Sequence, residues 1–211
     1  MENDENTLHE SSLKDPTRIL ALTDGVFAII MTLLVLELKV PKLSDTSKLY
    51  EELMNCGYQL LLYFASFLLA GVYWLGHRLL FSLIKYVNTT LVWLNIIFLM
   101  IASLIPFGAA LLGSYPHATE TLSMYGFLLT MLASWRLLMY VYATANRKLL
   151  HSAVPPKRRS RVITVMIVAP ILFLISICIV PFFPTLALVL YCVTPVIFVT
   201  LITIVNRYTS N

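Results

Sequence analysis

The stretch RILALTDGVFAIIMTLLVLEL, residues 18–38, has the length and apolar character of a membrane helix, which needs about 20 mostly apolar residues. It begins with Arg18 and carries Thr23, Asp24 and Gly25 roughly two turns further along. After Gly25, polar side chains are almost absent until Glu37. The stretch therefore predicts a membrane helix with a polar first part and an apolar second part.

The composition of the whole chain extends this prediction. Of its 211 residues, 59% are hydrophobic and 12% are charged, whereas a soluble domain carries about 25% charged residues. A soluble core of this size could not hide so much apolar surface from water. We therefore expect an all-α, polytopic protein of the cell membrane. Residues 1–15 are predicted to form a disordered tail, and residues 16–211 a membrane domain.

Six membrane helices are predicted, and Pro106, Pro170 and Pro195 are expected to kink the helices that contain them. Their ranges are about 17–39, 54–84, 87–114, 119–148, 161–182 and 184–206.

Basic residues predict the orientation of these helices. One side of the membrane receives Lys14, Arg18, Arg78, Lys85, Arg147, Lys148, Lys157, Arg158, Arg159, Arg161 and Arg207, and the other receives Lys39, Lys42 and Lys48. The positive-inside rule then predicts that both termini are cytoplasmic. The segment PPKRRSR, residues 155–161, could bind nucleic acid or lipid. A topology anchor is favoured, and no nucleic-acid partner is expected.

Charged and ionisable side chains within the predicted spans are few, and two of them, Asp24 and His77, are predicted at a similar depth. Asp24 lies about 9 Å deeper than Arg18 at 1.5 Å per residue, and His77 ends the second span at a similar depth, with Trp74 one turn before it. Asp24 and His77 could therefore meet, as a proton or ion relay or as a structural network. Thr23 could add an interhelical hydrogen bond, and Gly25 could allow close approach of a neighbouring backbone. The structural interpretation is favoured because no further acidic or histidine residue continues a relay at mid-depth.

The apolar part of the first helix has a regular pattern. Ile29, Thr32, Leu33 and Leu36 fall within about 100° of one another on a helical wheel. Periodicity alone favours a core stripe whose threonine hydroxyl bonds its own backbone.

Two charged residues have open interpretations. Glu37 could concentrate cations at a pore mouth, or it could be an interfacial charge paired with Lys39 or Lys42. Arg136, in the fourth span, could snorkel to the interface or contact another subunit.

Two sequence motifs resemble a known family. Residues 18–29, R-x-x-x-L-T-D-G-V-F-A-I, resemble the signature Arg-x-x-x-Phe-Ser-Asp of the transmembrane protein 175 family. Residues 73–78, YWLGHR, are similar to the family's Tyr-Trp-x-x-His segment on its second helix. Leu22 and Thr23 depart from the family's Phe and Ser, although Thr23 keeps the hydroxyl.

The resemblance implies a homotetramer with six helices per subunit, in which the first helices line a central pore. By the family pattern, Ile29 would form the narrowest constriction, Leu33 and Leu36 would continue it, and Thr32 would favour potassium through transient contact. Arg18, Thr23, Asp24, Gly25, Trp74 and His77 would then support the pore helix.

The function implied is that of a potassium-preferring cation channel, which would pass potassium and larger alkali cations. The sequence contains no TVGYG loop for carbonyl-based selection, and selectivity would instead depend on the cost of cation dehydration. No enzymatic activity, tightly bound metal or cofactor is expected. A secondary transporter or a non-conducting membrane scaffold is the alternative.

Overall fold

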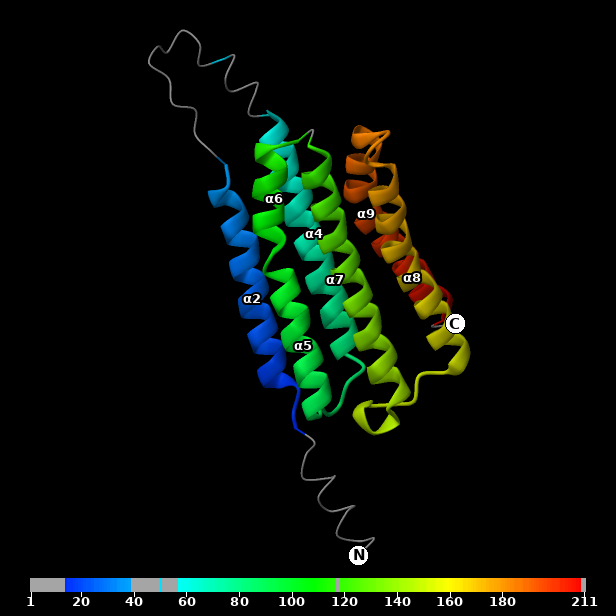
Figure 1. Cartoon of the computed structure of the whole chain (residues 1–211). Helices are drawn as coiled ribbons and strands as arrows, with labels where there is room; N and C mark the ends of the chain where they lie inside the picture. Colours follow the sequence, from blue (N-terminus) through cyan, green and yellow to red (C-terminus); the bar gives the residue numbers. More distant parts are fainter. Residues whose placement is uncertain (1–13, 39–49, 51–56, 117, 210–211) are drawn as a thin grey trace, which may run out of the picture.

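The computed structural model describes residues 14–38, 50, 57–116 and 118–209 of the chain. Long helices run up and down beside one another, and α9 returns toward the end of the bundle at which α2 begins (Figure 1). The elements are α2 (Thr17–Leu36), α4 (Gly57–Phe81), α5 (Thr89–Ala102), α6 (Ile105–Ser114), α7 (Thr119–Ala145), the 3-10 turn η2 (Arg147–Leu149), α8 (Pro156–Ile179) and α9 (Pro184–Thr209).

The third predicted span is two helices rather than one. α5 ends at Ala102, and α6 begins at Ile105 after the two-residue break Ser103–Leu104. Pro106 lies in the first turn of α6, where its missing N–H removes no helical hydrogen bond. The expected disturbance at Pro106 is therefore a complete break. By contrast, α8 and α9 continue through Pro170 and Pro195 without interruption.

Helix α8 begins about one turn earlier than predicted. It starts at Pro156, and proline is favoured at the first position of a helix because its fixed φ already suits the helix. The basic segment after Pro156 therefore occupies the first turns of α8 and not a loop. The predicted sixth span, 184–206, corresponds to α9, which extends to Thr209.

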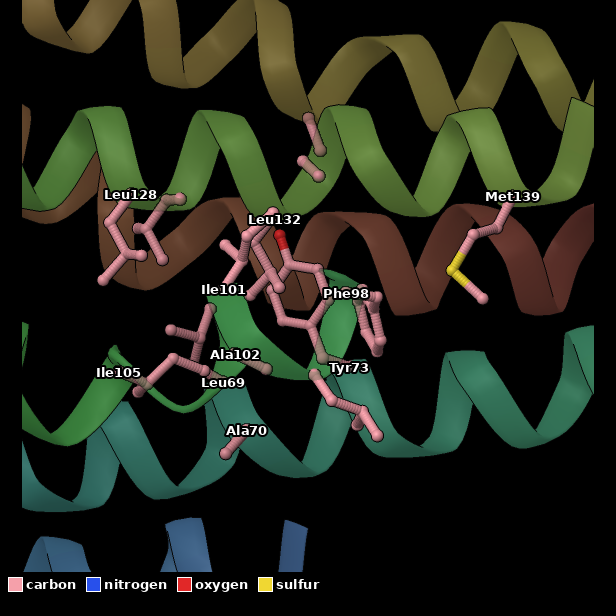
Figure 2. Packing of buried hydrophobic residues seen from close by; sticks show 14 of the residues in the cluster. Leu69, Ala70, Tyr73, Phe98, Ile101, Ala102, Ile105, Leu128, Leu132 and Met139 are labelled. Carbon is pink, nitrogen blue, oxygen red and sulfur yellow. The ribbon is translucent and has the colours of Figure 1, made fainter. Parts of the chain in front are cut away.

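The buried core lies between α4, α5 and α7. Figure 2 shows Leu69 and Tyr73 of α4 beside Phe98 of α5, with Leu132 of α7 closing the cluster. A hydrogen bond of 2.8 Å from Trp135 Nε1 to the Leu94 carbonyl also joins α7 to α5. Helix α2 packs against α4, α5 and α6 at one edge, and α8 and α9 lie at the other edge (Figure 1).

A backbone clasp ties together the end of the bundle at which α2 begins. Lys14 and Val87 exchange backbone hydrogen bonds of 2.9 and 2.8 Å. The same loop, between α4 and α5, pairs Ile84 with Leu150, which follows η2. The predicted disordered tail spans residues 1–15, and its residues 1–13 lie outside the described residues.

Five helical segments in the described chain are long and apolar enough to cross a membrane: Thr17–Leu36, Gln59–Phe81, Thr89–Ser114, Thr119–Ala145 and Pro156–Ile179. Helix α9 adds the shorter apolar segment Pro184–Phe198. Large apolar side chains such as Phe64, Phe182 and Phe183 lie on the outside of the bundle, as a lipid solvent allows. The chain is a multi-pass membrane protein with an all-α fold.

Candidate functional site

Helix α2 has one buried face and one exposed face. Ile19, Thr23, Phe27, Ile30 and Leu34 are buried against the rest of the subunit. The predicted stripe lies on the other side, since Ile29, Leu33 and Leu36 are 59%, 42% and 73% exposed and Thr32 is also exposed. These four residues are therefore not a core stripe within one subunit.

The exposed stripe also continues toward the start of α2. Arg18, Leu22 and Gly25 precede Ile29 at spacings of three to four residues, and all three are exposed. A Cβ atom added at Gly25 would meet nothing within 4 Å. The expectation that Gly25 admits a neighbouring backbone is thus not met within the subunit, and Gly25 leaves open space on the stripe.

The Thr32 hydroxyl bonds its own helix. It lies 3.0 Å from the Ala28 carbonyl oxygen and 2.9 Å from the Ile29 carbonyl oxygen, and donates to this pair. A hydroxyl that gives its hydrogen to the backbone keeps its oxygen lone pairs for other contacts. The Thr32 oxygen therefore presents acceptor capacity on the exposed face of α2.

Asp24 is held by Trp74 of α4. Trp74 Nε1 donates to Asp24 Oδ1 at 2.7 Å, and the Arg78 guanidinium carbon lies 5.3 Å from the centre of the Trp74 ring. A charge-assisted hydrogen bond of this kind is stronger than a neutral one. The indole thus fixes the carboxylate of α2 against α4.

Thr23 and His77 are joined by a residue that the sequence analysis missed. Asn95 of α5 donates from Nδ2 to Thr23 Oγ1 at 3.1 Å, and its Oδ1 lies 2.7 Å from His77 Nε2. Because Oδ1 can only accept, His77 Nε2 is the donor. All three side chains are buried, so this network connects α2, α5 and α4 in the interior.

Aromatic rings fix the plane of His77. Phe81 stacks on the imidazole at a centroid distance of 4.3 Å, and Phe98 stacks at 5.6 Å. Phe98 also contacts Phe27 of α2, at 6.0 Å. The same aromatic cluster that packs His77 therefore supports the buried face of α2.

The structure brings the predicted residues together in a different pairing from the one expected. Asp24 and His77 do not bond each other: Asp24 accepts a hydrogen bond from Trp74, and His77 donates one to Asn95. The signal for Asn95 was present, because it is the one strongly polar residue between Leu91 and Ala102 in the sequence.

The remaining charged residues differ in their environments. Glu37 caps the end of α2 and is exposed, while its suggested partners Lys39 and Lys42 lie outside the described residues. Arg136 is only 5% exposed, so its side chain is buried within the subunit. Among the described residues, no group of three or more His, Cys, Asp and Glu side chains could hold a metal ion.

Comparison with known proteins identifies the family. The sequence model described as the endosomal/lysosomal potassium channel TMEM175 matches residues 18–106, which include α2, α4 and α5 with the whole network. A potassium channel of Chamaesiphon minutus is 37% identical over 142 residues, which are 64% of this chain and 70% of that protein. The chain belongs to the TMEM175 family.

A further relative is similar in sequence, and a solved homologue has the same fold. A potassium channel of Chryseobacterium sp. is 39% identical over 116 residues, 55% of this chain, and the chain spans little more than half (58%) of that protein's length. The crystal structure of a lysosomal potassium-selective channel TMEM175 homologue from Chamaesiphon minutus superposes with a TM-score of 0.77 at 26% identity. That match covers 87% of this chain and 96% of the homologue. Membership of this channel family confirms that the chain is not an enzyme.

Proposed function

We propose that the chain is a potassium-preferring cation channel in which four copies place α2 around a common axis. The observation that carries this proposal is the exposed stripe of α2, on which Thr32 and Arg18 lie in line with Ile29. Polar and charged groups at membrane depth face protein or water and avoid lipid. A stripe that includes them and leaves the subunit core is suited to a water-filled axis. The relatives named as potassium channels support the same proposal.

Ile29 would be the constriction, with Leu33 and Leu36 above it on the same face. Four branched apolar side chains around an axis form a neck from which water withdraws when the neck is narrow, and an ion cannot cross it without its hydration shell. Because potassium holds water less tightly than sodium, such a neck favours potassium and the larger alkali cations.

Thr32 lies one turn from Ile29 and would add a ring of oxygens. Since each hydroxyl hydrogen is donated to the backbone at Ala28 and Ile29, the oxygen lone pairs remain available to accept. Four such oxygens can replace some of the water lost by a cation that enters the neck. Potassium would contact them in transit, with no tightly bound metal required.

The support network would keep the neck in register. On α2, Thr23 and Asp24 lie off the stripe, and their bonds reach Trp74 of α4 and, through Asn95, His77 of α4. These bonds would set the rotation of α2 about its own axis. A rotation of one residue, about 100°, would remove Ile29 from the pore. Both termini would lie in the cytoplasm, as the distribution of basic residues predicts.

Ion flux into liposomes tests the proposal directly. The purified protein is expected to dissipate a potassium gradient faster than a sodium gradient, and Ile29→Asn should raise flux by wetting the neck. Val35→Asn is the matched control, because Val35 is also exposed on α2 (46%) but lies off the stripe. Lower or unchanged flux in Ile29→Asn would contradict the constriction.

Thr32 is tested by ion selectivity and not by total flux. Thr32→Ala should reduce the preference for potassium over sodium, and Thr32→Ser, which keeps the hydroxyl, should retain most of it. An unchanged ion ratio in Thr32→Ala would remove Thr32 from the selectivity mechanism.

The same vesicles separate a channel from the alternatives. A secondary transporter would couple potassium to a second ion in a fixed ratio, which a parallel measurement of proton and sodium movement would detect. A non-conducting scaffold would give no flux in the parent or in Ile29→Asn.

A further inference from the structure

Arg136 of α7 points into a cavity that the proposed pore does not use. Its side chain is only 5% exposed, and it lines a cavity of about 130 Å³ between α4, α7 and α8. The wall includes Leu75, Gly76, Leu79, Tyr140, Arg158 and Val162. A cavity of this volume has room for several water molecules or a small oxyanion.

Among the residues that the structure describes, no carboxylate pairs with the charge of Arg136. The chain contains no Asp or Glu after Glu120, and the α4 sequence contains none, so α4, α8 and α9 carry no carboxylate and α7 has only Glu120 in its first turn. Among the described residues no hydrogen bond leaves the guanidinium; its contacts are the Tyr73 and Phe198 rings, at 5.6 and 4.1 Å from Cζ. Ring contacts compensate only part of the cost of burying a charge.

Gly76 shapes the site around the guanidinium. A Cβ atom at Gly76 would lie 2.5 Å from Arg136 Nη1 and 2.8 Å from its Cζ. Glycine at this position therefore leaves the room in which the guanidinium lies against α4.

The cavity also lies near one end of α4. Gly76 is five residues from the end of α4 at Phe81, or about 8 Å at 1.5 Å per residue. Arg158, in the first turn of α8, lines the same cavity. A ligand that enters between α4 and α8 would therefore have a second cation in the wall and apolar side chains below it.

We propose that this cavity binds a phosphate group, supplied by an anionic phospholipid or by free inorganic phosphate, with Arg136 as its principal donor. The planar guanidinium offers five N–H groups in a fork that matches the oxygens of a phosphate. A bound phosphate would supply Arg136 with the negative charge and the acceptors that the described part of the chain does not offer it.

Binding to the purified full-length protein tests the proposal. Native mass spectrometry would measure binding of palmitoyl-oleoyl-phosphatidylglycerol, with a diacylglycerol of the same chains as the phosphate-free control. Calorimetry would measure inorganic phosphate, with chloride as control. Arg136→Gln should weaken binding about 10- to 100-fold, since a hydrogen bond to a charged group contributes that much. Arg147→Gln, an exposed arginine in η2, should leave binding unchanged.

The possible results separate the sources of phosphate. Phosphatidylglycerol binding alone identifies the lipid, and binding of both probes identifies a site for either. Binding that is absent, or equally strong in Arg136→Gln, would overturn the proposal; in the first case the counterion would have to come from another copy of the chain. If Arg136→Gln does not fold, Gly76→Ala should weaken binding by displacing the guanidinium, and unchanged binding there would also overturn it. None of these readouts depends on ion flux.

Discussion

Replacing Asn95 by leucine should destabilise the subunit by about 2–6 kcal/mol. The substitution keeps the number of side-chain heavy atoms and removes two interhelical hydrogen bonds, to His77 at 2.7 Å and to Thr23 at 3.1 Å. Interhelical bonds in membranes average about 0.6 and reach about 1.7 kcal/mol each, which gives about 1–3 kcal/mol for two. The buried Nε2–H of His77 would also lose its acceptor, which costs about 1–3 kcal/mol of folding free energy. The Thr23 hydroxyl would not be left unpaired, because it can donate to a carbonyl of its own helix.

Titration with sodium dodecyl sulfate in mixed micelles measures this loss. The fluorescence of Trp74, Trp93 and Trp135 would report the unfolding of α4, α5 and α7. Thr130→Val is the matched control, because the Thr130 hydroxyl bonds only the Gly126 carbonyl of its own helix, and it should cost less than about 1 kcal/mol.

The reasoning fails if Asn95→Leu unfolds within about 0.5 kcal/mol of the parent, which is the size of an ordinary surface substitution. It also fails if Thr130→Val costs as much as Asn95→Leu. Either result would mean that the three-helix network does not hold α2 in place.

Three further predictions follow from single contacts. Trp74→Phe should cost about 1 kcal/mol in the same titration, because it removes the N–H that bonds Asp24, whereas Trp93→Phe, at a 59% exposed position, should be neutral. Gly126→Ala should cost about 1–3 kcal/mol, since the new Cβ would overlap the Tyr191 hydroxyl and lie 2.7 Å from Ile177; Gly113→Ala, whose Cβ would make an ordinary 3.5 Å contact, is its control. The hydroxyl and amide of Thr17 lower the pKa of Asp15, so the contribution of this carboxylate to the start of α2 is present at neutral pH and is lost as the pH falls through the lowered pKa. An NMR titration of the Asp15 carboxyl should give a higher pKa in Thr17→Ala, and an equal pKa would contradict the assignment.

Hydropathy predicted the helices well because membrane helices need a minimum apolar length that the sequence displays directly. The predicted start of the first helix at residue 17 and of the last at residue 184 agree with α2 and α9. At Pro106 the sequence predicted a kink and the structure has a break at Ser103–Leu104, and the early start of α8 at Pro156 was not predicted. Both depend on whether a proline occupies the first turn of a helix or its interior, and hydropathy does not distinguish these positions.

The candidate site was predicted less completely than the fold. The motif residues Thr23, Asp24, Trp74 and His77 do lie in one connected region, but their pairing depends on the rotation of α4 relative to α2. Thr23 and His77 both bond Asn95 of α5, and a single amide in an apolar helix has no periodic signature. The exposure of Ile29 and its neighbours could not be inferred either, because an apolar stripe has the same sequence pattern whether it faces a protein core, lipid or the axis of a pore.

The backbone clasp at Lys14 and Val87 constrains how the first helix can move. Only two residues separate Lys14 from Thr17, so the N-terminal end of α2 has little freedom to move. It must move together with the loop between α4 and α5, which also pairs with Leu150. Sliding of α2 along its own length would require the two backbone bonds of Lys14 to break, whereas swinging of its far end requires neither. Any change in the width of the bundle would therefore require α2 to pivot about its N-terminal end, with the largest displacement near Leu36.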